Sequence, residues 1–420
     1  MGLGVSLIAE PPRSGILARK RFHLAELLEV FQGVLHLPAP LDRLARFTVG
    51  ESAARAHLTP LEAPVTFRID DRGRLLVTAP TQMTGPGYHQ QVVSGLTELA
   101  RHQRFYWDES GNASDPASYF ADRDFPSLQR EFAWDLARLS RRLMREAGGV
   151  DIGLPDDLVP LDTPCFARTQ RGPRDRQFFE EAANPDTAEQ SAADHFPWWD
   201  SGLTGRTALG MAEALAWSVF PWRAGLYDSE RVVGEVISEL ATKTRGEEDL
   251  DGRLGLSELT EILAAEMDLG PQPDGPGFLR GRVLRPLTGG WKIALPGHFT
   301  SRFDSKTSCV SYWFKDREVH ATTYAAHERE LNLEAEADAA MGEISEMRDE
   351  HLFVADFGAA RGQDWEAVEL EGRVRTPGGL AIVSILVEGD ADRDWALDTF
   401  RSIRFDQGGQ QHPERQAASF

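Results

Sequence analysis

The chain has 420 residues, more than one ordinary hydrophobic core accommodates, and this length predicts two or three domains. Hydrophobic residues make up 41% of the chain, which excludes a globally disordered protein. The formal net charge of −21 repels nucleic acid and anionic membranes, so we expect neither as a partner and expect a basic protein instead. Solubility alone is the competing explanation of this charge.

Cysteine content and hydropathy indicate the compartment. The two cysteines, Cys165 and Cys309, lie far apart and form neither a disulfide framework nor a CxxC metal pair. The N-terminus lacks the features of a secretory signal, and no apolar run is long enough for a membrane helix. Only five of the 45 basic residues are lysines, which indicates GC-rich coding. We therefore expect a cytoplasmic protein of bacterial type.

Residues 1–150 predict an N-terminal α+β domain. His23–Leu37 places its leucines at helical spacing, and Pro38 ends that helix. Val65–Pro80 alternates apolar and polar residues about a DDRG turn, which predicts a β-hairpin. A further helix is expected over Gly85–Gln103, and Phe125–Gly149 carries the single apolar stripe of a long amphipathic helix.

The rest of the chain divides by composition. Residues 151–194 are rich in Pro, Asp and Arg and predict a linker or surface excursion, whereas 195–270 predict a helical region. From 278 to 406, strand-like segments predict an α/β sandwich, and 407–420 predict a flexible tail. The expected fold class is therefore α+β: a multi-domain chain in which antiparallel sheets are packed with helices.

The segment HFPWWDSG, residues 195–202, sets His195 and Asp200 around two adjacent tryptophans. Trp198 and Trp199 could form an exposed partner-binding patch, and filling a seam between domains is the alternative. GPGYHQ, residues 85–90, precedes a helix, and its backbone N–H groups could hold an anion beside Tyr88 and His89. A tight capping turn is the competing explanation.

The segment EEDLDGRLGLSE, residues 247–258, resembles the calcium-binding loop of the EF-hand family. Gly252 and Leu254 fill the slots that the family keeps for glycine and an apolar residue. The resemblance implies calcium as a cofactor, with oxygen ligands from Glu247, Asp249, Asp251 and Glu258. Glu247 departs from the family because its side chain is long for the first slot. A solvated acidic turn is the alternative, and no other cofactor is expected.

The segment SCVSYWFKDREVHATTY, residues 308–324, predicts a hairpin with one core-like face that includes Val310, Tyr312 and Phe314. The opposite face carries Trp313 and His320 and could meet a helix or a partner. The alternative is that both faces are packed within a two-layer domain, because aromatic and β-branched residues are ordinary strand residues. His320 and Cys309 have no orienting acid nearby in the sequence, so a catalytic pair is not predicted.

Residues 332–350 are densely acidic and predict a helix between strands. Its carboxylates either face solvent or meet a basic partner. The residues expected to meet a partner are Glu334, Glu336, Asp338, Glu343 and Glu346.

The stretches GGWKIALPGHFTSRFDSKTSCVSYWFKDREVHATTY and LAIVSILVEGDADRDWALDTFRSIRF resemble the Mog1/PsbP-like α+β sandwich. The resemblance covers roughly the last third of the chain. It implies a sandwich fold whose members mostly bind proteins and are not enzymes. The acidic insertion departs from the family pattern, and no functional residue is carried over.

These observations favour a non-enzymatic protein-binding module of the inhibitor, immunity or regulatory type that docks a basic protein. One alternative is a hydrolase that uses His89 or His195 with a carboxylate, since active sites also assemble from residues distant in sequence. A second alternative is binding regulated by calcium.

Overall fold

The computed structural model describes residues 3–12, 21–108, 115, 118–145, 150–155, 158–224, 227–244, 246, 249–265, 275–325, 342–361 and 366–406. The chain divides into two compact units, residues 1–154 with 163–278 (unit 1), and 155–162 with 279–420 (unit 2). Each unit packs helices on antiparallel or mixed sheets, which confirms the predicted α+β fold class. The finer boundaries at residues 150, 194 and 270 stay predictions.

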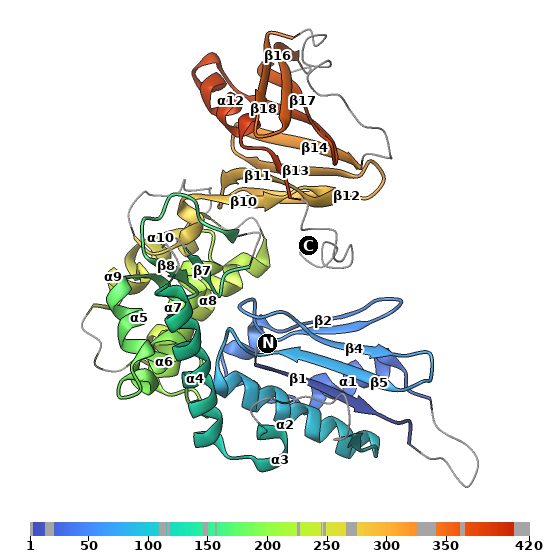
Figure 1. The fold of residues 1–420 in the computed structure, drawn as a ribbon, viewed down its shortest axis with the longest axis vertical. Coiled ribbons are helices and arrows are strands. Elements are labelled where there is room, and N and C mark those ends of the chain that lie inside the picture. Colours follow the sequence, from blue (N-terminus) through green and yellow to red (C-terminus); the bar gives the residue numbers. More distant parts are fainter. Residues whose placement is uncertain are drawn as a thin grey trace. The chain divides into compact units, whose positions relative to one another are not determined.

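Unit 1 contains a six-stranded sheet in the order β2-β3-β4-β5-β1-β6. Figure 1 labels four of these strands, β1, β2, β4 and β5. All of its strand pairs are antiparallel. Its strands are β1 (Gly4–Ala9), β2 (Arg46–Val49), β3 (Ala54–His57), β4 (Val65–Ile69), β5 (Leu75–Pro80) and β6 (Trp107–Asp108). The predicted hairpin is the β4–β5 pair.

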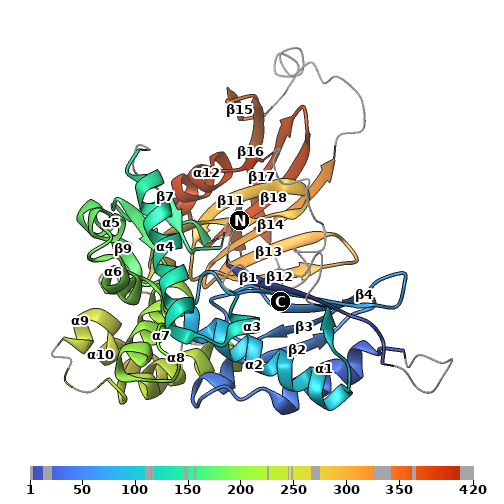
Figure 2. The same ribbon diagram turned by 60° about the horizontal axis from the view of Figure 1, so that its bottom comes forward.

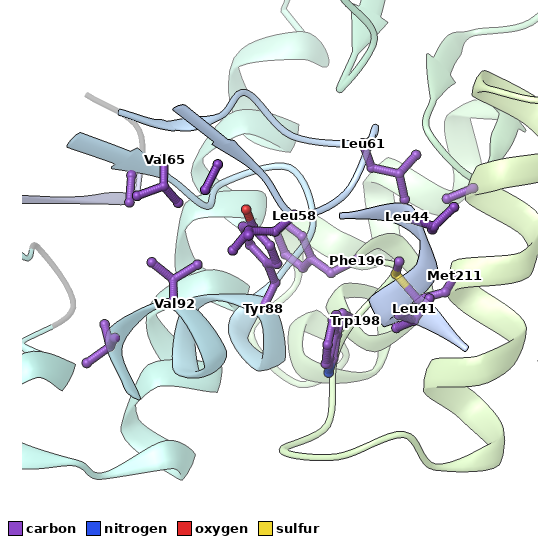
Figure 3. Packing of buried hydrophobic residues seen from close by; sticks show 14 of the residues in the cluster. Leu41, Leu44, Leu58, Leu61, Val65, Tyr88, Val92, Phe196, Trp198 and Met211 are labelled. Carbon is purple, nitrogen blue, oxygen red and sulfur yellow. The ribbon is translucent and has the colours of Figure 1, made fainter. Parts of the chain in front are cut away.

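Two predicted helices cover this sheet, α1 (Leu24–Val34) and α2 (Pro86–Gln103). Their buried side chains share one hydrophobic cluster with the strands, as Val92 and Val65 do (Figure 3). The helix α2 begins after Gly85 with Pro86 in its first turn, where the missing proline N–H costs no hydrogen bond.

The remainder of unit 1 is mostly helical. Its helices are α3 (Tyr119–Asp122), α4 (Phe125–Leu143), α5 (Arg176–Ala183), α6 (Ala188–His195), α7 (Gly205–Ser218), α8 (Asp228–Ala241), α9 (Leu250–Leu254) and α10 (Leu256–Ala264). Asp124 caps α4, because its side-chain oxygen accepts a hydrogen bond from the Ser127 backbone N–H. Thr204 caps α7 in the same way and accepts from the Thr207 backbone N–H. Figure 2 shows α5 and α6 beside α4.

Residues 151–194, predicted as a linker or surface excursion, contain regular structure. The strands β7 (Val150–Ile152), β8 (Ala167–Thr169) and β9 (Gly172–Arg174) form a small mixed sheet. Helix α5 follows with only eight residues, so its apolar periodicity is too short to stand out in the sequence.

Unit 2 is built on a seven-stranded antiparallel sheet in the order β12-β13-β14-β18-β17-β16-β15. Its strands are β12 (Thr300–Asp304), β13 (Cys309–Phe314), β14 (Arg317–Ala325), β15 (Ile344–Arg348), β16 (His351–Arg361), β17 (Glu366–Thr376) and β18 (Gly379–Val387). The β13–β14 pair is the predicted hairpin, and Val310, Tyr312 and Phe314 are buried as expected.

One face of this sheet is covered. A three-stranded sheet of β10 (Arg282–Pro286), β11 (Trp291–Pro296) and β19 (Arg404–Phe405) shares a hydrophobic cluster with it, and so does α12 (Arg393–Arg401). Phe400 of α12 packs so closely on Gly372 of β17 that a side chain there would collide with its ring. We call this covered side the inner face and the opposite side the outer face.

The acidic segment 332–350 differs from the predicted helix in its described part. Ile344–Arg348 is the strand β15, paired with β16. Strand pairing with a buried neighbour outweighs the helical preference of its Glu and Met residues. Glu334, Glu336 and Asp338 lie outside the described residues.

No helix in the part of the chain that the structure describes has the length and apolar character needed to cross a membrane.

Candidate functional site

The outer face brings chemically active side chains together across six strands, from β12 to β16. Because paired residues of neighbouring strands point to the same side, the register alone groups them into cross-strand rows. One row contains Trp313, Glu318, Leu386 and Glu369. The next contains Arg302, Ser311, His320, Ser384, Glu371 and Asp356.

A continuous hydrogen-bonded chain joins three of these side chains. The Ser311 hydroxyl lies 2.9 Å from Nδ1 of His320, and Nε2 of His320 lies 3.2 Å from Oε2 of Glu318. Cys309 is next to this chain, with its Sγ 3.9 Å from the Ser311 Oγ. A serine, a histidine and a carboxylate in this order are the groups that nucleophilic catalysis uses.

The hydrogen-bond partners determine the histidine tautomer. A carboxylate only accepts hydrogen bonds, so in neutral His320 the ring proton is on Nε2, and this N–H donates a hydrogen bond to Glu318. Nδ1 then has a free lone pair, which accepts the hydrogen bond from the Ser311 hydroxyl. The imidazole is therefore oriented to take the serine proton.

Carboxylates gather at one end of the outer face. Glu318, Glu369, Glu371 and Asp356 occupy the two rows described above, and we call them the acidic end. The Ser384 hydroxyl donates to Glu369 at 2.6 Å, which fixes that carboxylate. The arginines of β17 lie in the following rows, so the face is electrostatically polarised along the strands.

The outer face is open over β12, β13, β14, β17 and β18. The side chains of His320 and Glu318 are 37% and 47% exposed, and Tyr324 and Ile382 are also exposed. In the described part of unit 2, the α-helix α12 lies on the inner face. On β16, by contrast, Leu352 and Val354 are buried, whereas Asp356 of the same strand is exposed.

Sequence reasoning assigned no orienting acid to His320, and the structure corrects this: Glu318 stands two residues away on the same strand face. The alternation of side chains along β14 could have revealed this acid, because residues two apart on a strand, such as Glu318 and His320, point to the same face. Ser311, which is paired with His320, and Arg302, which is paired with Ser311, were also missed, because only the strand register reveals them. Trp313, predicted as a partner-binding residue, lies half-buried on this face opposite Glu318.

The two histidines of the hydrolase hypothesis lie in unit 1, and both are buried. His89 contacts Thr81 through Nδ1 at 2.9 Å and has Oδ1 of Asp115 3.6 Å from its Nε2. A histidine–carboxylate pair does form there, but both side chains are enclosed. Burial, and then the charges of Arg174 and Arg171, lower the pKa of His195 to about 3, which makes it a weak base.

A buried polar cluster accompanies these residues at the start of α2. Burial raises the pKa of Glu62 to about 7, although the N–H groups of Met83 and Thr84 donate to its carboxylate at 2.8 and 3.2 Å. Burial also raises the pKa of the Tyr88 phenol, with a smaller effect of Glu62. Residues 85–89 of the GPGYHQ segment are buried, and the Gly87 N–H at the start of α2 donates to the Trp198 carbonyl.

Trp198 and Trp199 belong to the hydrophobic core of unit 1 and are 1% and 6% exposed. Figure 3 shows Trp198 among Tyr88, Phe196 and Met211. Their burial corrects their assignment to an exposed partner-binding patch. The physical reason is close backbone packing: Gly87 donates its N–H to the Trp198 carbonyl at 3.0 Å, and the chain has room there only for glycine.

The described part of the EF-hand-like segment forms two short helices, α9 and α10, around Gly255 in a left-handed conformation. Asp249 caps α9 by accepting the Gly252 N–H, and Asp251 accepts the Ser257 N–H. Glu247 lies outside the described residues. Over the described ranges, no three or more His, Cys, Asp or Glu side chains are grouped to hold a metal ion. Calcium binding through Asp249, Asp251 and Glu258 stays a prediction.

The described members of the acidic set are Glu343 and Glu346. Glu346 points to the inner face and accepts hydrogen bonds from Arg401 at 2.7 Å and Arg348 at 3.0 Å. Glu343 is exposed, and its backbone N–H donates to Asp356 at 2.6 Å. Glu346 thus helps to hold α12 to the sheet, and the assignment of Glu343 and Glu346 to a partner surface stays a prediction.

Comparison with known proteins gives no family for this chain. No family model matches, and no curated protein matches. A crystal structure from Bacteroides thetaiotaomicron, at 1.50 Å resolution, is similar over 30% of this chain and 48% of that one, with 8% identity and a TM-score of 0.24.

Proposed function

We propose that the chain is a protein-binding module of the inhibitor, immunity or regulatory type, and that a basic partner protein docks on the acidic end of the outer face. The observation that supports this proposal is the grouping of Glu318, Glu369, Glu371 and Asp356 on adjacent rows of an open sheet face. The net charge of −21 adds a long-range attraction for a basic partner.

Trp313 supplies the apolar part of the proposed interface. It stands beside Glu318 in the same row, at the border of the acidic end. Tryptophan is enriched among the residues that contribute most to binding energy, because it buries a large area with few rotatable bonds. A basic side chain of the partner can also stack on the indole ring while it meets the carboxylates.

The experiment starts with capture of a partner from the source lysate at low salt, followed by titration of the purified partner into the full chain. We expect the double variant Glu369→Gln/Glu371→Gln to raise Kd by about tenfold, as two exposed ion pairs at about 0.5–1 kcal/mol each imply. Trp313→Ala is expected to raise Kd further, by about 30-fold or more.

The matched control is Asp394→Asn/Asp398→Asn, which removes the same charge from α12 on the inner face. This control is expected to leave Kd within about twofold, because screening at physiological salt limits distant charges. Equal weakening by both double variants would show that net charge, and not the acidic end, attracts the partner. Unchanged binding in the Glu369/Glu371 variant would refute the proposed surface.

A further inference from the structure

We propose that Ser311 is a nucleophile toward small carboxylic and phosphonic esters, with His320 as its general base and Glu318 as the orienting acid. This inference goes beyond protein binding and does not require the proposed partner. It rests on the hydrogen bonds at 2.9 and 3.2 Å that connect the three side chains in series.

The sheet holds this geometry rigidly. Ser311 and His320 are directly opposite each other in the β13–β14 register, and Glu318 is two residues from His320 on the same face. Their Cβ positions are therefore fixed by backbone ladders on both sides, since β14 also pairs with β18. Preorganisation of this kind is what a general base needs in order to act on a neighbouring hydroxyl.

A cation stands on the other side of the nucleophile. Arg302 of β12 is opposite Ser311 in the register and belongs to the same row. Directly opposed residues have Cβ atoms about 4.5–5.5 Å apart, within reach of a guanidinium group. Arg302 is exposed, so it is available to stabilise negative charge that develops on a substrate oxygen.

The chemical step conserves atoms and charge. The Ser311 hydroxyl passes its proton to Nδ1 of His320 while Oγ forms a bond to the carbonyl carbon of the ester. The tetrahedral oxyanion faces Arg302, and its collapse breaks the bond to the alcohol, which takes the proton from His320. Water then cleaves the acyl–serine ester by the same route, with His320 again as the base.

The open face determines the class of substrate. His320 and Glu318 are 37% and 47% exposed, so small molecules reach them directly. An open surface buries little of a ligand, and it therefore selects by chemical reactivity more than by shape. Small activated esters and fluorophosphonates are the probes that fit these conditions.

The test is covalent labelling of the full chain with a biotinylated fluorophosphonate, followed by peptide mass spectrometry. In the labelling reaction, Oγ bonds to phosphorus, the P–F bond breaks, and His320 receives the proton as fluoride leaves. We expect the label on Ser311, with a rate that falls at least about tenfold in His320→Ala, as the loss of a general base implies. p-Nitrophenyl acetate should be hydrolysed faster by the wild-type chain than by Ser311→Ala.

Two matched controls lie in the same sheet. Ser384→Ala removes a serine whose hydroxyl donates to a carboxylate, Glu369, and it should keep the label. Cys309→Ala removes the neighbouring thiol and should keep it too, which separates serine from cysteine chemistry. His320→Gln retains a hydrogen-bonding side chain that cannot serve as the base, so it decides the result if His320→Ala does not fold.

Labelling of Ser311 that depends on His320 would support the proposal. Absence of labelling, a label on another residue, or an unchanged rate in folded His320→Gln would overturn it and leave the hydrogen bonds with a structural role in the hairpin. Because none of these readouts involves a partner protein, the proposed binding function is tested independently.

Discussion

Replacement of Glu62 by glutamine tests whether a largely buried carboxyl near the start of α2 destabilises unit 1 at neutral pH. Burial raises the pKa of this group from 4.5 to about 7, so the folded protein binds the proton more tightly than the unfolded chain does. The stabilising effect of protonation is complete below about pH 4.5. This effect is lost as the pH rises to about 7, and above that pH the contribution of Glu62 to the free energy of unfolding no longer changes.

The magnitude follows from the shift. A difference between 4.5 and about 7 corresponds to about 3 kcal/mol at 1.36 kcal/mol for each pKa unit. Glu62 is not completely enclosed, and water offsets part of this cost, so we expect a change of about 2–3 kcal/mol. Glutamine carries no charge, and its Oε1 still accepts the N–H groups that Met83 and Thr84 donate to the native carboxylate.

The assay is hydrogen exchange of the β4–β5 amides at several pH values, because it reports the opening free energy of unit 1 within the full chain. From pH 4.5 to pH 7.5, the opening free energy of Glu62→Gln should gain about 2–3 kcal/mol relative to the wild-type chain. Other titrating groups, including His195, are common to both proteins and cancel in this difference. Glu29→Gln, an exposed site on α1, is the matched control and should show no such trend. A difference that stays within about 0.5 kcal/mol over this range would refute the assignment of a buried, shifted carboxyl.

Two further substitutions test the packing of unit 1. Glu213→Ala removes the carboxylate to which buried Arg171 donates through Nε at 2.8 Å and Nη2 at 2.6 Å. Thermal unfolding should show that the free energy of unfolding falls by about 3–5 kcal/mol, because the arginine is left buried without its partner. A decrease below about 1 kcal/mol would mean that the pair contributes little. Gly87→Ala introduces a Cβ that overlaps the Trp198 ring and the Asp200 carbonyl. Urea unfolding should therefore show that the free energy of unfolding falls by about 1–3 kcal/mol or more. An unchanged urea midpoint would contradict the packing of this turn.

The sequence by itself determined the elements with strong local patterns. The β4–β5 hairpin, α2, α4 and the two-faced β13 strand all follow from hydrophobic periodicity, because each buries a stripe or face that its own residues define. The α+β class followed from the order of these elements. Short elements such as α5 were missed, since eight residues carry too little periodicity.

Tertiary structure alone decided which side chains meet. Tryptophan is a residue type typical of binding surfaces, but Trp198 is buried, because other core residues of unit 1 pack against it. His320 looked unpartnered in the sequence, and the β13–β14 register gave it Ser311 while strand alternation gave it Glu318. Strand register, cross-strand partners and burial depend on contacts between residues far apart in the chain, and local sequence patterns do not specify those contacts.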